Sequence, residues 1–259
     1  MPTPTNSALF VLADAIAELQ NYRLPMMAAN FPLPVIPDAA TLTKKILAAE
    51  SELARKLGIY LQPTTIFGGA DPSADAIAAL NGAPYAVESG YDMTPDFFST
   101  WQWGTFLLRS RPVQSVASIK FIYPSLNAQV VDIPTTWMQV DKRIGLVNLV
   151  PGPGGLNIPL NIFSMQAMNS GSTVPNMIRV VYVAGLDPSN PFYADVQDMA
   201  MKLVALRILK DTFQPQSGSI SADGLSQSVS TDVTKFGAAI DSEIADLRER
   251  LVGPILGTF

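Results

Sequence analysis

The chain of 259 residues contains no histidine and no cysteine. Histidine is the side chain most often used as a general base near neutral pH, and with cysteine it ligates most protein zinc. Thiolate nucleophiles and disulfides both require cysteine. The two absences therefore exclude a histidine-activated serine, a thiol enzyme, a disulfide framework and a Cys/His zinc site. Carboxylates, hydroxyls, lysines and backbone groups remain for any chemistry.

Charge is also scarce in this chain. Charged residues make up 15% of it, whereas an ordinary soluble domain has roughly 25%. With 48% hydrophobic residues, this composition predicts that a partner subunit covers part of the surface. The 17 basic and 22 acidic side chains give a net charge of −5, which disfavours binding through nucleic-acid phosphates. No secretory signal is visible and no apolar run reaches the roughly 18 residues that span a membrane, so we expect no membrane partner.

Helical periodicity recurs along the chain. It predicts helices over residues 8–20, 38–58, 191–213 and 232–251. Asp38 or Thr41 is expected to cap the second helix, which ends at Gly58. The charged residues of that helix are interpreted as a solvated face: Lys44, Lys45, Glu50, Glu52, Arg55 and Lys56. The third helix is apolar around much of its circumference, so we expect it at the centre of the helical layer.

Between the second and third helices the periodicity becomes that of strands. The β-type runs are Phe106–Arg109, Val113–Ile122, Val130–Ile133, Trp137–Val140, Ile144–Val150 and Met177–Val183. Their short connections leave no room for helical crossovers, which favours an antiparallel arrangement. We therefore predict an α+β fold, a helical layer with an inserted antiparallel β-sheet or small sandwich, plus extended N- and C-terminal arms.

The predicted organisation has three parts. Residues 1–37 form an N-terminal helix and a proline-rich arm, 38–213 form an α+β core with a β-rich insertion at about 104–186, and 214–259 form a serine-rich loop, a C-terminal helix and an apolar tail. The prolines of Leu24–Pro37 forbid a helix, and this strap packs either on its own core or on a neighbouring subunit.

One long stretch, Leu57–Leu108, contains no basic residue. It holds five acidic residues: Asp71, Asp75, Glu88, Asp92 and Asp96. Aromatic residues gather in its second half, between Tyr85 and Trp103. Paired carboxylates flanked by aromatic platforms can bind or cleave a glycan. The alternative is that these aromatics pack the junction between helices and sheet, which is their commoner use.

No motif for phosphate binding, nucleophilic catalysis, calcium binding or glycosylation occurs. Instead, the order of several short structural motifs resembles that of head–tail connector (adaptor) proteins of tailed bacteriophages and prophages, over about Asp38 to Leu251. The motifs that carry the resemblance are Ala48-Ala49-Glu50-Ser51-Glu52-Leu53, Leu57-Gly58-Ile59, Leu107 to Val116, Trp137, Gly145, Val181 to Leu186 leading into the Asp195–Leu209 helix, and Asp223 to Ser228.

The resemblance implies a homo-oligomeric ring, typically a dodecamer, in the virion neck, assembled in the host cytoplasm. Such a ring docks beneath the portal, receives downstream neck or tail proteins, and lets genomic DNA pass as cargo through its channel. It implies no catalytic residue, cofactor or metal, so no enzyme activity is expected. It also implies that the C-terminal segment reaches the portal, which here involves Ile255, Leu256 and Phe259.

Two alternatives stay open at this point. One is another neck or tail-completion ring protein, which differs from an adaptor in its position in the particle. The other is a glycan-binding or glycan-cleaving module that uses residues 85–103. An acidic lumen would let DNA slide without sticking, so we expect the basic-free stretch to line the channel of a ring.

Overall fold

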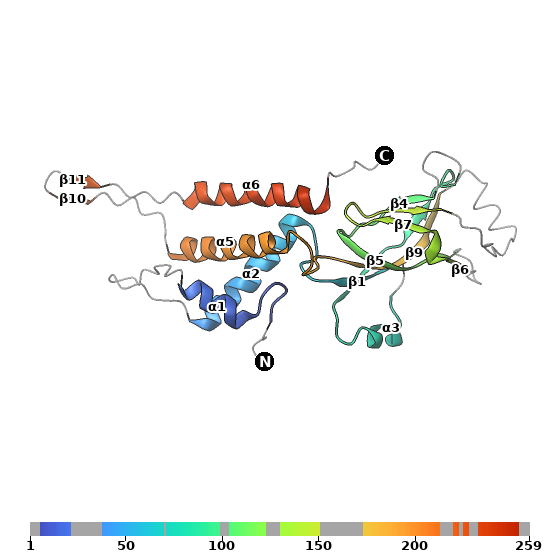
Figure 1. The fold of residues 1–259 in the computed structure, drawn as a ribbon, viewed down its shortest axis with the longest axis horizontal. Coiled ribbons are helices and arrows are strands. Elements are labelled where there is room, and N and C mark those ends of the chain that lie inside the picture. The colour runs from blue at the N-terminus through green and yellow to red at the C-terminus, as the bar shows by residue number, and fades with distance from the viewer. Residues whose placement is uncertain are drawn as a thin grey trace. The chain divides into compact units, whose positions relative to one another are not determined.

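The computed structural model describes residues 6–21, 38–69, 71–98, 104–122, 130–150, 173–212, 220–222, 225–227 and 233–253. The chain forms two compact units. The helical unit comprises Met1–Leu61 and Pro188–Arg250, and the sheet unit comprises Gln62–Asp187 and Leu251–Phe259. The sheet unit is thus inserted in the sequence between helices of the helical unit (Figure 1). This organisation confirms the predicted α+β fold, a helical layer with an inserted β-sheet.

The helical unit contains all four predicted helices. They are α1 (Leu12–Asn21), α2 (Ala39–Leu57), α5 (Tyr193–Thr212) and α6 (Val233–Val252). Helix α1 begins four residues later than predicted, because the residues before it form a turn closed by a β-bridge between Asn6 and Val11. The serine-rich segment contains a small antiparallel hairpin of β10 (Ile220–Ala222) and β11 (Leu225–Gln227).

Helix α2 buries one apolar stripe, as its periodicity predicts. The buried residues of the stripe are Leu42, Ile46, Ala49, Leu53 and Leu57. Burying a leucine or isoleucine of this kind contributes about 1.5–3 kcal/mol to the free energy of unfolding. The helix ends at Gly58, whose φ of +70° suits glycine and whose amide donates to the Ala54 carbonyl. Helix α5 packs against α2 and is buried on several sides, which confirms its predicted central place.

The interpretation of the α2 charges as a solvated face is wrong for part of the set. Glu50 is buried, with 5% of its surface exposed. Glu52 pairs with Lys56 one turn later and with Arg207 on α5, both at 2.7 Å. Lys56 also pairs with Asp241 on α6 at 2.6 Å. These ion pairs connect three helices that lie far apart in the sequence.

The sheet unit contains a six-stranded sheet with the order β2-β1-β9-β5-β6, in which β3 also pairs with β9. Its strands are β1 (Thr64–Gly68), β2 (Tyr85–Glu88), β3 (Tyr91–Met93), β5 (Val113–Ile122), β6 (Val130–Ile133) and β9 (Val174–Ala184). A second sheet has the order β4-β8-β7, with β4 (Thr105–Leu107), β7 (Met138–Asp141) and β8 (Leu146–Leu149). One apolar core, which includes Ile119, Ile178 and Val147, joins strands of both sheets.

All six predicted strands are present, but the larger sheet is mixed, not purely antiparallel. Strands β1 and β2 run parallel and are connected through α3 (Ala74–Ala79), a helical crossover that the sequence did not predict. Both strands and the helix are too short to show a clear period. Ser73 caps α3 by accepting a hydrogen bond from the Ala76 amide at 3.2 Å.

Candidate interaction surfaces

The N-terminal segment before α1 is held on the helical unit by the carboxylate of Glu50, which comes from α2. One of its oxygens accepts hydrogen bonds from the Ser7 hydroxyl at 2.6 Å and the Leu9 amide at 3.0 Å. The other accepts one from the Ala8 amide at 3.3 Å. Hydrogen bonds from amides to a carboxylate are stronger than neutral ones. Glu50 therefore fixes the path of residues 7–9.

Helix α5 also holds this segment, by donating hydrogen bonds to the backbone carbonyl of Leu9. The Leu9 carbonyl accepts hydrogen bonds from the Gln197 amide group at 2.8 Å and from the Tyr193 hydroxyl at 3.2 Å. Burial and the nearby charge of Glu50 raise the pKa of Tyr193, so this hydroxyl keeps its proton. Leu9 is thus bound through its amide to α2 and through its carbonyl to α5.

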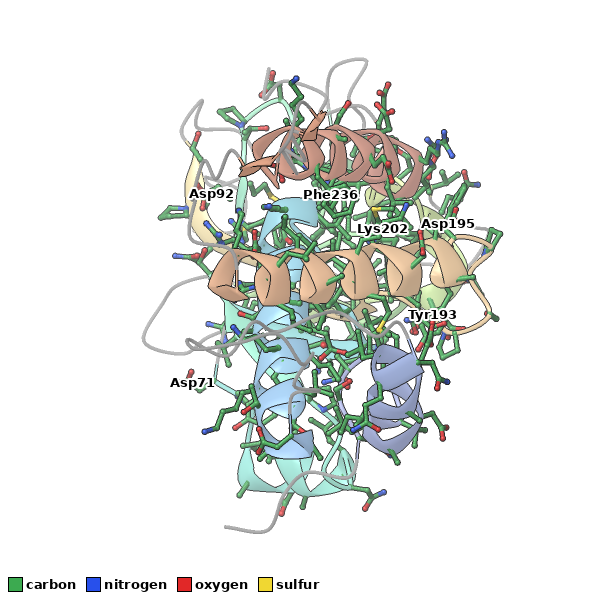
Figure 2. All side chains as sticks on the ribbon, turned by 90° about the vertical axis from the view of Figure 1, so that its left-hand side faces the viewer. Asp71, Asp92, Tyr193, Asp195, Lys202 and Phe236 are labelled. Carbon is green, nitrogen blue, oxygen red and sulfur yellow. The ribbon has the colours of Figure 1, made fainter. Side chains whose placement is uncertain are left out.

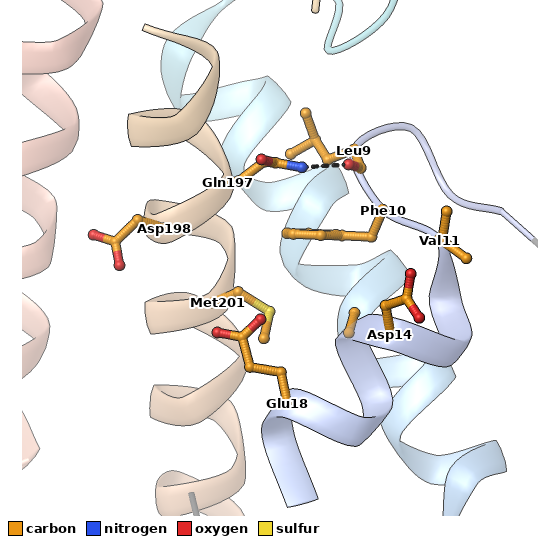
Figure 3. Close-up of a pocket in the computed structure, with 9 residues that line it drawn as sticks. Leu9, Phe10, Val11, Asp14, Glu18, Gln197, Asp198 and Met201 are labelled. Carbon is orange, nitrogen blue, oxygen red and sulfur yellow. Dashed lines mark hydrogen bonds between the residues drawn. The ribbon is translucent and has the colours of Figure 1, made fainter. Parts of the chain in front are cut away.

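This fixed segment and helix α1 form one wall of a groove of about 500 Å³, which we call the N-terminal groove (Figure 3). Helix α5 forms the opposite wall. The nine lining residues are Leu9, Phe10, Val11, Asp14, Ala15, Glu18, Gln197, Asp198 and Met201. Val11 is 52% exposed, which is high for a residue of its size and apolar character.

The N-terminal groove is acidic. Three of the nine described residues that line it are carboxylates, and none is basic. In Figure 3 the carboxylate of Glu18 extends toward Met201 of α5 and that of Asp14 toward Val11, whereas that of Asp198 points away from the groove. Asp198 instead pairs at 3.0 Å with Lys202, which is labelled in Figure 2. Lys202 also pairs with Glu243 of α6 at 2.8 Å. The hydrogen bond with Glu243 and, to a smaller extent, that with Asp198 raise the pKa of Lys202.

A second surface lies in the sheet unit, around α3. None of the α3 side chains is buried, and Ile77 is 37% exposed. Figure 1 shows α3 standing off from the strands of its unit. Asp71 and Asp75 are both exposed beside these apolar residues. We call residues 71–84 the acidic excursion; it belongs to the stretch of sequence without lysine or arginine.

Glu88, another carboxylate of the stretch without lysine or arginine, is bound by two tyrosines. Glu88, at the end of β2, accepts a hydrogen bond from the Tyr91 hydroxyl at 2.6 Å. The Tyr182 hydroxyl lies 3.1 Å and 3.2 Å from its two oxygens. Tyr91 and Tyr182 accept in turn from the amides of Arg109 at 3.0 Å and Ser110 at 3.1 Å. Burial is the main cause that raises the pKa of each tyrosine, so both donate as neutral phenols.

Arg109 completes this network. Its guanidinium donates to the carbonyls of Ser89 and Gly90 and lies over the Tyr91 ring, 4.3 Å from the ring centre. The carbonyl, phenol and carboxylate groups of this network therefore all have hydrogen-bond partners, although they are partly buried. The arrangement connects the turn between β2 and β3 to the segment between β4 and β5 and to β9.

Among the described residues of the glycan hypothesis, Glu88 and Asp92 are engaged by protein groups and do not form a sugar site. Glu88 is held by two tyrosines, and Asp92 accepts a hydrogen bond from the Asn176 amide at 2.8 Å. Tyr91 and Phe106 pack with ring centres 5.4 Å apart, and Phe97 lies in the same core. These aromatics pack the interior of the sheet unit, whereas the sequence placed them at a junction with the helices. Trp101 and Trp103 lie outside the described residues.

The residues predicted to bind the portal, Ile255, Leu256 and Phe259, also lie outside the described residues. So does the proline-rich strap. Within the described part of the chain, no group of acidic residues is arranged to hold a metal ion. No helix of that part is long and apolar enough to cross a membrane.

Sequence reasoning missed the N-terminal groove and its anchor, Glu50. A signal was present, because Glu50 lies four residues after Ile46 and three before Leu53, on the buried stripe of α2. An acidic residue on an apolar stripe indicates a carboxylate with a buried partner. The partner amides lie more than forty residues away in the sequence, which no local pattern indicates.

No protein-family model matches the chain, and no curated protein sequence is similar to it. Among solved structures, the fold is similar to a chain from the neck of an empty gene transfer agent particle, computed with C6 symmetry, at 12% identity and a TM-score of 0.42. It is also similar to a chain from the virion of a native gene transfer agent particle, at 12% identity and a TM-score of 0.41. In both cases the match covers 100% of this chain and 96% of the other.

Proposed function

We propose that this chain is a structural subunit of the neck of a tailed phage or phage-like particle. In this proposal it forms a homo-oligomeric head–tail connector ring that docks beneath the portal and receives the tail. The observation that carries the proposal is the sheet unit inserted between α2 and α5, two helices that pack together. This is the organisation that the order of motifs from Asp38 to Leu251 implies for a connector.

The exposed surfaces support an assembled subunit. A ring subunit presents two different lateral faces to its neighbours and hides both from water. The helical unit exposes apolar Val11 and Phe236, the latter labelled in Figure 2, and the sheet unit exposes Tyr85 and Val87. If a neighbouring copy covers these side chains, their apolar surface is removed from water, which stabilises the assembly. The low charge of the chain has the same explanation.

The acidic excursion suits the wall of a DNA channel. Its carboxylates Asp71 and Asp75 are exposed, and no basic residue occurs between Leu57 and Leu108. Negative charge repels DNA phosphates, so the genome would pass without binding. This role requires no catalytic residue, and we propose that the protein is not an enzyme.

Docking to the portal is proposed for the apolar C-terminal segment, through Ile255, Leu256 and Phe259. The alternative within the same class is another neck or tail-completion ring, which would assemble with a different neighbour. No contact of the described residues favours the glycan-binding alternative, because Glu88 and Asp92 are engaged by protein groups.

The test is to mix the purified full chain with portal protein and measure the masses of the products by native mass spectrometry. The proposal predicts a complex that contains one portal ring and a ring of this chain. A chain that stays separate from portal but joins a different neck ring would favour the neck or tail-completion alternative. A chain that stays separate from both and binds polysaccharide would overturn the proposal.

A further inference from the structure

We propose that the free edge of β2 in one copy pairs with the free edge of β6 in the neighbouring copy, so that the six-stranded sheet continues from subunit to subunit. The inference rests on the proposed ring and names one contact between its subunits. It gives Val87 of β2 and Val130 of β6, which are 47% and 46% exposed, a place in that contact.

Strands β2 and β6 are the two outer strands of the six-stranded sheet. Among the described residues, no strand pairs with the outer edge of either one. An unpaired edge presents amide and carbonyl groups that can pair with an added strand, and natural sheets often block it with lysine, proline or a bulge. The β2 strand, Tyr85–Glu88, contains no lysine and no proline, so its edge is open to pairing.

The hydrogen bonds between β1 and β2 determine which backbone groups of β2 point outward. The Thr65 amide of β1 donates to the Pro84 carbonyl at 3.0 Å. Backbone groups of successive strand residues point to opposite sides of the strand. The even-numbered residues of β2 therefore bond to β1, and the amides and carbonyls of Tyr85 and Val87 point to the free edge.

The same alternation, followed across the sheet, determines the outward groups of β6. Odd-numbered residues of β1 face β2, so even-numbered ones face β9, and the odd-numbered residues of β9 face β5. Arg179 of β9 and Lys120 of β5 thus direct their backbone groups toward each other, whereas the next β5 residue faces β6 and its partner Val131. The amides and carbonyls of Val130 and Asp132 consequently point to the free edge of β6.

The two edges also match in strand direction. Strands β1 and β2 run the same way, β9 runs opposite to them, β5 opposite to β9, and β6 opposite to β5. Strands β2 and β6 are therefore antiparallel. A rotation about an axis along the strands keeps these directions, so β2 meets the neighbour's β6 in the antiparallel arrangement, which is the more stable one.

The exposed side chains of the two edges lie on one face of the sheet. Val87 and Val130 alternate with Ala86 and Val131, which pack against the apolar core. Both exposed valines therefore lie on the opposite, open face. A sheet that continues into the next copy without reversing its faces brings these two side chains together and removes their apolar surface from water.

This arrangement specifies the register of the contact. Val87 lies opposite the neighbour's Val130, and Tyr85 lies opposite the neighbour's Asp132. Each of these two pairs exchanges two hydrogen bonds, up to about four in all. A strand of one copy on the opposite edge of the next is a head-to-tail contact, which is the type that generates a ring.

The absence of cysteine from the chain permits a direct test by disulfide cross-linking. The full-length double variant Val87→Cys/Val130→Cys places cysteines in an antiparallel pair whose Cα atoms lie about 5.5 Å apart, within the roughly 4.4–6.8 Å of a disulfide. Within one chain the two positions are four strand spacings apart, roughly 19 Å, so only different copies can be linked. Mild oxidation, with and without portal protein, should give a ladder of covalent oligomers on a denaturing gel.

The matched control moves one cysteine by a single residue. In Val87→Cys/Val131→Cys the second cysteine lies on the core face of β6, where it cannot reach the neighbour's β2 cysteine on the open face. The single variants Val87→Cys and Val130→Cys contain no second position to link. None of these three variants should give the ladder.

A second experiment removes one hydrogen-bond donor from the edge. Val87→Pro deletes an amide that points to the free edge and leaves the bonds to β1 in place, so the fold should be kept, as measured by circular dichroism and melting temperature. Association should be at least about tenfold weaker than that of the wild type, measured by light scattering. Val87→Thr keeps the amide and should associate like the wild type. If Val87→Pro loses its fold, the cross-linking experiment decides.

Three results would overturn the proposed contact. A double variant Val87→Cys/Val130→Cys that forms a ring by native mass spectrometry but gives no ladder would exclude the contact and leave the ring intact. A covalent dimer of Val87→Cys alone would show that β2 pairs with β2 of a second copy about a two-fold axis. A chain that stays monomeric with and without portal would overturn both the contact and the proposed ring.

Discussion

The buried carboxylate of Glu50 accepts a hydrogen bond of 3.0 Å from the backbone amide of Leu9, across a separation of 41 residues. No lysine or arginine pairs with this carboxylate among the described residues; three donors of the N-terminal segment surround it instead. The contact makes the position of the N-terminal segment, and hence of the N-terminal groove, depend on one side chain of α2.

Replacing Glu50 by alanine should lower the free energy of unfolding by about 2–4 kcal/mol, because the amides of Ala8 and Leu9 lose their acceptor. Urea denaturation measures this loss. Hydrogen exchange of the Leu9 amide should also become much faster. The control is Glu243→Ala, which removes an exposed ion pair with Lys202 and should cost less than about 1 kcal/mol. Equal losses in the two variants would contradict the anchoring role of Glu50.

Stability should fall in acid through Glu52. Burial acts to raise the pKa of this residue, but hydrogen bonds from Lys56 and Arg207 outweigh it and hold the pKa below its ordinary value of 4.5. A carboxyl whose pKa is lowered by folding stabilises the fold fully above its unfolded pKa and loses that contribution as pH falls through the folded pKa. The loss therefore begins near pH 4.5 and continues below it.

Urea denaturation of the wild type and of Glu52→Gln at pH 7 and at pH 3 measures this dependence. The variant should be less stable than the wild type at pH 7, and the difference should shrink at pH 3. Because Glu52 is partly exposed, solvent screening limits the difference to the order of 1 kcal/mol. A difference that is the same at both pH values would contradict the role given to the ion pairs.

Replacing Tyr182 by phenylalanine should lower the free energy of unfolding by about 1–3 kcal/mol. The Tyr182 hydroxyl donates to Glu88 and accepts from the Ser110 amide, and both partners are left without it in the variant. Tyr60→Phe is the matched control, since this tyrosine is exposed. Urea denaturation compares them, and an equal effect of both changes would contradict the network around Glu88.

Removal of residues 254–259 should leave the fold intact and weaken docking to the portal. The cut falls after Gly253, because Leu251 and Val252 are buried and Gly253 packs close to Ile144. A longer truncation that also removes Leu251 should lower the melting temperature, which separates loss of fold from loss of docking. Portal binding is measured by native mass, and unchanged binding of the shorter variant would contradict the role proposed for Ile255, Leu256 and Phe259.

Much of the fold could be predicted from the sequence, because long periodic segments carry their own signal. The stripe from Leu42 to Leu57 and the strands β5 and β9 are long enough to show one period clearly. The β1-α3-β2 crossover of the sheet unit was not predicted, because its elements span only four to six residues each. Its parallel pairing depends on contacts between strands, which local sequence does not indicate.

The candidate surfaces were less predictable than the fold. The acidic character of the stretch around Asp71 and Asp75 could be read directly, because charge is a property of composition. The N-terminal groove could not, since it requires Phe10 and Met201 to meet from opposite ends of the chain. Glu88 illustrates the same limit, because its role depends on Tyr182, 94 residues away.

Electron microscopy of the full chain bound to portal protein tests the central claim most directly. The account predicts a closed ring of this chain beneath the portal, with the acidic excursion, Asp71 and Asp75 included, on the wall of the channel. A portal preparation without a bound ring, or a ring that carries the acidic excursion on its outer rim, would contradict the account.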